Sequence, residues 1–151
     1  MAHLDYDRIL PRSVVEMPAS GIRKFFDILD SMTDVTALTV GQPDFVTPWK
    51  IREAGIESLE SGKTYYTSNA GTLELRREIS NYMSRRFNLQ YDPAKEVVVT
   101  VGGSEAIDVA MRTILQPGDE VIIPTPCWVS YPEMVRMAGG RSVLVECPEE
   151  N

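Results

Sequence analysis

The chain has 151 residues, of which 43% are apolar, 25% charged and 8% aromatic, as in an ordinary globular domain. These proportions exclude collagen-like, coiled-coil and wholly disordered proteins. The 15 Lys and Arg against 22 Asp and Glu give a net charge of −7. This balance argues against nucleic acids and anionic membranes as partners, because both attract basic surfaces.

The N-terminal residues predict an arm rather than a leader peptide or a long helix. Asp5 and Asp7 interrupt the first ten residues, and two prolines follow before residue 20. A short helix is expected over residues 22–32, and a β-rich run over 35–40 leads into a loop that begins at Gly41. No window of the sequence approaches the roughly 18 uncharged apolar residues of a membrane-spanning helix.

The chain offers few residues for metal binding or nucleophilic catalysis. Cys127 and Cys147 are too few for a disulfide framework, so a reducing cytoplasm is the expected location. The single histidine, His3, lies near the N-terminus, which argues against Ser–His–Asp, Cys–His and zinc sites. No metal site is predicted.

Two amphipathic helices flank a polar loop in the middle of the chain. Thr47 as N-cap and Pro48 at the first helical position open a helix that stops near Gly62. A loop with two tyrosines occupies residues 65–71. The next helix is expected over residues 73–88.

From residue 96 onward, the pattern changes to strands that alternate with helices. Val97–Val101 is a β-branched run typical of a strand buried on both faces of a parallel sheet. Further strands are expected at Val121–Ile123, where Pro124 ends the run, and at Ser142–Val145. Helices are expected from about Ala106 to Ile114 and from Tyr131 to Met137. The alternation predicts βαβ units and an α/β fold.

The junction between the first strand and its helix, at Gly102-Gly103-Ser104, is a candidate phosphate site. Small residues let a ligand approach the backbone, and the first N–H groups of a helix favour an anion. A tight turn would explain the two glycines equally well. The G-x-G-x-x-G pattern is not completed after Gly102, which argues against an NAD site, and Gly62-Lys63-Thr64 lacks the first glycine of a P-loop.

Trp128 is the second candidate, because ligands in open α/β sheets gather at the carboxyl ends of strands. Its indole can stack on a planar ring in the crevice that Gly103 faces. Packing beneath a loop is the commoner role of such a tryptophan. Cys127, its neighbour, is expected to be a buried thiol.

Together, these motifs resemble the N-terminal part of class I and II aminotransferases, which are pyridoxal-phosphate enzymes of fold type I. The similarity covers residues 12 to 151, and its motifs lie in register. They are Gly41–Phe45, Gly62–Thr67 and the stretch from there to Arg76, Val101–Ala106, Pro117–Val121, Trp128–Pro132 and Ala138–Gly140.

The fold that the resemblance implies is an incomplete α/β large domain, a mostly parallel sheet with flanking helices, at residues 48–151. An N-terminal arm and part of a small domain precede it at residues 1–47. In such a sheet, a strand like Val97–Val101 does not pair directly with the other two, because later strands lie between them.

The resemblance also implies a cofactor, pyridoxal 5'-phosphate. The backbone amides of Gly103, Ser104 and Glu105 would hold its phosphate, and Glu105 stands where relatives carry Lys or Gln. Trp128 would stack on the pyridine ring. Tyr66 would reach the phosphate bound by a neighbouring subunit, so two subunits of a homodimer would share each active site.

The implied reaction moves an amino group between an L-amino acid and a 2-oxo acid. The backbone of Gly41 would meet the substrate carboxylate, and Ile22 would line the substrate pocket. The sequence does not reveal the amino donor. Relatives with the motif at residues 20–25 resemble both aromatic- and aspartate-directed enzymes, and an aromatic donor is the expectation.

The catalytic residues that the resemblance implies are not in this chain. The Schiff-base lysine, the aspartate at the pyridine nitrogen and the arginine for the substrate carboxylate are expected beyond Asn151. We therefore expect the 151 residues alone to be inactive and to expose unpaired strand edges and an incomplete core. The alternatives are a phosphate-ligand binding domain and an aminotransferase-like regulatory or dimerisation domain, neither of them catalytic.

Overall fold

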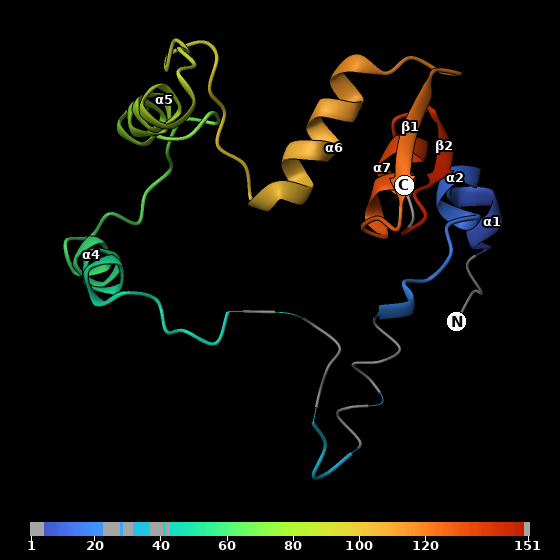
Figure 1. The fold of residues 1–151 in the computed structure, drawn as a ribbon, viewed down its shortest axis with the longest axis horizontal. Coiled ribbons are helices and arrows are strands. Elements are labelled where there is room, and N and C mark those ends of the chain that lie inside the picture. The colour runs from blue at the N-terminus through green and yellow to red at the C-terminus, as the bar shows by residue number, and fades with distance from the viewer. Residues whose placement is uncertain (1–4, 23–27, 29–31, 37–40, 42, 150–151) are drawn as a thin grey trace. The chain divides into compact units, whose positions relative to one another are not determined.

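The computed structural model describes residues 5–22, 28, 32–36, 41 and 43–149 (Figure 1). His3 and most of the expected helix over 22–32 and of the β-rich run over 35–40 lie outside the described residues. The elements are α1 (Tyr6–Ile9), α2 (Arg12–Val15), α4 (Trp49–Glu60), α5 (Leu73–Phe87), α6 (Gly102–Ile114), β1 (Glu120–Thr125), α7 (Ser130–Met137) and β2 (Arg141–Glu146). They belong to two units, Met1–Thr33 with Val101–Asn151, and Asp34–Thr100.

The first unit contains the β–α–β arrangement that the sequence predicts. Strands β1 and β2 are parallel and in register from Glu120 opposite Arg141 to Thr125 opposite Glu146. The side chains of Glu120 and Arg141 form an ion pair at one end of the ladder. Helix α7 connects the strands, packs against both and buries Val135 (Figure 1). The expected α/β character is confirmed in this unit.

The sequence predicts that the strand at Val121–Ile123 ends at Pro124. This prediction is wrong, because β1 continues through Pro124 to Thr125. Pro124 lies opposite Val145 of β2. Among the described residues, β1 has a single neighbouring strand. A proline has no backbone N–H to donate to a neighbouring strand, and a strand with one neighbour tolerates this loss at positions whose N–H would point away from that neighbour.

The expected strand at Val97–Val101 is also wrong. This segment has no regular structure, and Val98 is 64% exposed rather than buried between two layers. The backbone N–H of Val99 donates to the carbonyl of Ala70, which lies in a loop, at 3.0 Å. A β-branched run becomes a strand only where a neighbouring strand supplies a regular series of backbone hydrogen-bond partners. A loop does not supply such a series.

The second unit contains the two expected helices, α4 and α5. Helix α4 has Pro48 as its N-cap, so the predicted cap at Thr47 is wrong by one residue. Its end is closed by bonds from the N–H of Lys63 to Ser58 and from Gly62 to Leu59, at 3.0 Å each. Such bonds satisfy carbonyls that the end of a helix leaves without partners.

Helix α5 begins and ends close to where the sequence predicts. The Thr72 hydroxyl accepts a hydrogen bond from the N–H of Leu75 at 3.4 Å, as an N-cap side chain does. Asn88 ends the helix in the left-handed conformation, with φ of 56°. The expected helix over 73–88 is confirmed.

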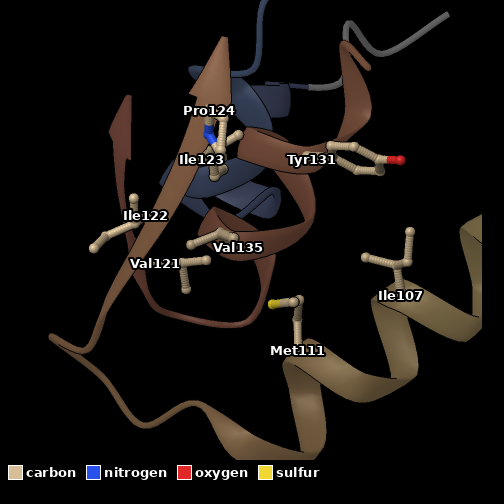
Figure 2. A pocket seen from close by; sticks show the side chains of 8 residues that line it. All are labelled: Ile107, Met111, Val121, Ile122, Ile123, Pro124, Tyr131 and Val135. Atoms are coloured by element: carbon tan, nitrogen blue, oxygen red, sulfur yellow. The ribbon is translucent and has the colours of Figure 1, made fainter. Parts of the chain in front are cut away.

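Few apolar side chains are buried in the described part of either unit. They are Ile123 and Val135 in the first unit and Val97 in the second. An apolar groove of about 290 Å³ lies between α6, β1 and α7, where Figure 2 shows Met111 extending toward Val121 and Val135. Ile122 of β1 is 70% exposed. The expectation of an open strand edge and an incomplete core is confirmed for the described residues.

Candidate functional site

The candidate phosphate site begins where Val101 leads into α6. Gly102 has a φ of +80°, a left-handed conformation that favours glycine. A Cβ added to Gly102 or to Gly103 would meet nothing within 4 Å. Ser104 and Glu105 are also exposed, so the backbone of the first helical turn is open to a ligand.

The N–H groups of this turn suit an anion. In a helix that starts after Val101, the amides of Gly103 and Ser104 precede the first i→i−4 bond and have no acceptor within the helix. The N–H of Glu105 is the first with a helical acceptor, the carbonyl of Val101. The helix dipole adds positive potential, and the Ser104 hydroxyl is a further donor. These groups fit a phosphate, with Gly103 and Ser104 better placed than Glu105.

The side chain of Glu105 makes a contact that the motifs in the sequence do not specify. Its carboxylate accepts a hydrogen bond from the backbone N–H of Val101. An acidic side chain in the first turn of a helix is stabilised by the dipole, which is the signal in the sequence that predicts such a contact. The carboxylate therefore places a negative charge in the turn that is expected to hold phosphate.

Trp128 lies between the end of β1 and the start of α7. Its carbonyl accepts a hydrogen bond from the N–H of Tyr131 at 3.1 Å, and its side chain is 51% exposed. The indole is thus not packed away beneath a loop. Cys127 is half-buried rather than fully buried, because the loop that holds it lies at the surface. Trp128 and Gly103 belong to the same unit, and their facing a common crevice stays a prediction.

The other expected site residues are divided between the two units. Tyr66 lies in the loop at residues 65–71 of the second unit, and its side chain is 103% exposed. Gly41 is exposed in the same unit, with open space where a Cβ would be. Ile22 is half-buried in the first unit. Their roles stay predictions.

The described residues form neither a metal-ligand cluster nor a membrane-spanning helix. No group of three or more His, Cys, Asp or Glu side chains there is arranged to hold a metal ion. None of the helices in the described ranges is long and apolar enough to cross a membrane.

Comparison with known proteins shows one consistent similarity. Residues 33–151 match the family described as aminotransferase class I and II. The Bacillus subtilis protein YugH, described as a candidate aminotransferase, is 56% identical over 132 residues, which are 87% of this chain and 34% of that protein. The aspartate aminotransferase of Pyrococcus abyssi is 45% identical over 132 residues, again 87% of this chain and 34% of the relative.

Solved structures agree with the sequence comparison. The aspartate aminotransferase of Thermus thermophilus with maleate superimposes with a TM-score of 0.85 at 43% identity. The match covers 93% of this chain and 38% of that one. The chain spans about a third of the length of the curated relatives that it matches.

Proposed function

The chain belongs to the class I and II aminotransferase family, and from this premise we propose that it forms the N-terminal part of an aminotransferase. The enzyme would move an amino group between an L-amino acid and a 2-oxo acid with pyridoxal 5'-phosphate, the cofactor of this family. The observation that carries the proposal is the open first turn of α6. It presents the amides of Gly103 and Ser104 within a segment that matches the family.

The residues of this chain would bind and orient the cofactor. The N–H groups of Gly103 and Ser104 would bind the phosphate, whose charge the α6 dipole favours. The exposed indole of Trp128 would stack on the pyridine ring and fix its plane. When bound, the cofactor supplies an electron sink for the bonds at the α-carbon of the substrate.

We also propose that the active enzyme is a homodimer with shared sites. Tyr66 supports this proposal, because its fully exposed side chain can contact another subunit without any rearrangement of its own core. Its hydroxyl would donate to the phosphate held by that subunit. The backbone of Gly41 and the side chain of Ile22 would contact the substrate.

The amino donor and the cellular location are further parts of the proposal. The relatives include aspartate aminotransferases and an aromatic-amino-acid aminotransferase, and we propose an aromatic donor with aspartate as the alternative. The two described cysteines, Cys127 and Cys147, are both free thiols, which supports a reducing cytoplasm in which amino acids are metabolised.

The proposed activity is tested with the full-length protein that contains this segment. L-Aspartate and L-phenylalanine are supplied as donors with 2-oxoglutarate as the acceptor, and the new amino acid is quantified. Transfer that depends on pyridoxal 5'-phosphate is the expected result. A folded protein that binds the cofactor but transfers no amino group from either donor would instead favour a binding domain.

The same assay on the 151-residue chain alone separates binding from catalysis. The lysine that attacks the cofactor in this family is expected outside the chain, so no transfer above the rate of free pyridoxal 5'-phosphate is anticipated. Turnover by the isolated chain would contradict this part of the proposal.

A further inference from the structure

Arg76 of α5 is a buried cation in the second unit. Its exposed fraction is 8%, and within the described residues it forms no ion pair with a carboxylate. Its Nε donates to the carbonyl of Gly71 at 3.2 Å, and its Nη1 donates to Pro93 at 2.9 Å and to Ala94 at 3.2 Å. Burial of a guanidinium is costly unless its N–H groups are bonded, so the arrangement points to a specific constraint on the backbone.

The three carbonyls belong to two segments that are distant in sequence. Gly71 closes the loop at residues 65–71, which carries Tyr66. Pro93 and Ala94 lie in the turn before residues 96–100, which run directly into the first turn of α6. The planar guanidinium of an arginine can donate hydrogen bonds to both segments at once. The compact ammonium group of a lysine is less suited to this role.

The C-terminal end of the loop at residues 65–71 is also bonded to the segment at residues 96–100. The carbonyl of Ala70 accepts the N–H of Val99 at 3.0 Å. The backbones approach so closely here that a Cβ on Gly71 would lie 2.7 Å from the Cγ2 of Val99. Within the loop, the N–H of Gly71 also bonds to Ser68 at 2.8 Å. These bonds hold the end of the loop that carries Tyr66, at Ala70 and Gly71, against the segment before α6.

We propose that Arg76 is a positioning residue for the phosphate contact of Tyr66. It fixes Gly71 against the segment that leads into α6, and thereby fixes the loop from which Tyr66 extends. Arg76 itself touches neither cofactor nor substrate in this scheme. The inference rests on the proposed function, because it requires Tyr66 to bind the phosphate of a neighbouring subunit.

A double-mutant cycle in the full-length protein tests the proposal. The variants are Tyr66→Phe, Arg76→Met and the double variant, with Arg77→Met as the matched control on the exposed face of the same helix. The measured quantity is the dissociation constant of pyridoxal 5'-phosphate from the dimeric apoprotein. Each single variant is expected to weaken binding about tenfold, as for one hydrogen bond to a charged group.

The double variant is expected to bind no more weakly than Tyr66→Phe, because both changes remove the same contact. Arg77→Met is expected to bind like the wild type. If the fold increase of the dissociation constant in the double variant equals the product of the two single increases, the effects are independent. Arg76 would then act on the fold alone, and the proposal would be overturned. If Arg76→Met does not fold, Arg76→Lys takes its place in the cycle, with a smaller loss expected.

Two further readouts separate this inference from the proposed function. Protease cleavage within residues 65–71 of the apoprotein is expected to accelerate in Arg76→Met and not in Tyr66→Phe. Equal rates in the two variants would show that the hydrogen bonds of Arg76 do not hold the loop. Unchanged cofactor binding in Tyr66→Phe would overturn the role of Tyr66 and, with it, that of Arg76. Amino transfer by the wild-type protein reports independently on the proposed function.

Discussion

The carboxylate of Glu105 accepts a hydrogen bond from the backbone N–H of Val101 at the start of α6. The first turn of α6 therefore carries a negative side chain beside the amides of Gly103 and Ser104, which we propose bind a phosphate. The dipole that would attract the phosphate also holds the carboxylate. Two negative groups at one helix end repel each other, so cofactor binding and the position of Glu105 are expected to be coupled.

Replacement of Glu105 by Gln is expected to strengthen cofactor binding. Gln keeps an oxygen that can accept the Val101 N–H but removes the charge that opposes the phosphate. A charge at an exposed helix end contributes about 0.3–1 kcal/mol, so the dissociation constant of pyridoxal 5'-phosphate should fall about two- to fivefold. Titration of the full-length apoprotein at low ionic strength measures the change.

The control is Glu78→Gln on α5, which alters the net charge equally and keeps the contact to Asn81. It is expected to leave the dissociation constant unchanged. Weaker binding in Glu105→Gln would show that the carboxylate supports the site rather than opposing it.

Gly71→Ala is expected to destabilise the protein, because the new Cβ would lie 2.7 Å from Val99 and the φ of +89° disfavours a side chain. Left-handed strain and overpacking together cost about 2–4 kcal/mol. Gly55→Ala is the matched control: it lies within α4, where the Cβ meets nothing within 4 Å. It should stabilise by about 0.5–1 kcal/mol. Thermal unfolding of both variants measures the opposite shifts, and a neutral Gly71→Ala would disprove the close approach.

Helices were predicted more reliably than strands because their stabilising bonds are local. The Thr72 cap and the Asn88 end both lie within the sequence window of α5. The residues of Val97–Val101 have strong β propensity, but whether they form a strand depends on pairing with strands elsewhere in the fold. The prediction that Pro124 ends β1 is wrong for the same reason, because the effect of a proline on a strand depends on how many strands pair with it.

The local geometry of the first turn of α6 follows from the sequence in part, for similar reasons. The open turn at Gly103 follows from local chemistry, because small residues and a helix start are visible in sequence. The contact between Glu105 and Val101 is also local, because the two residues are four positions apart. The spacing alone does not specify it, because the Glu105 side chain can adopt other conformations that point away from Val101. The hydrogen bonds from Arg76 to Pro93 and Ala94 join residues 17 and 18 positions apart, and no short-range pattern specifies such contacts.

The ion pair of Arg112 with Asp108, at 2.8 Å on α6, is expected to leave the pH dependence of stability unchanged in the neutral range. The hydrogen bond to Asp108, together with its charge, raises the pKa of Arg112. A raised pKa stabilises the fold below the ordinary pKa of arginine, and the contribution is lost only as pH rises through the higher value. Asp108→Asn should therefore lower the melting temperature equally at about pH 6 and about pH 9. A difference that grows between these two conditions would contradict this assignment.

Substitution of Trp128 tests whether its exposed indole binds the cofactor ring. Trp128→Leu should weaken binding of pyridoxal 5'-phosphate about two- to tenfold, the contribution of an aromatic stack, whereas Trp128→Phe should retain most of the affinity. The other tryptophan, Trp49, provides the control, because it lies on α4 with Arg52 over its ring at 5.3 Å. Trp49→Leu should bind the cofactor like the wild type. Equal affinities of Trp128→Leu and the wild type would remove Trp128 from the site and leave the first turn of α6 as its support.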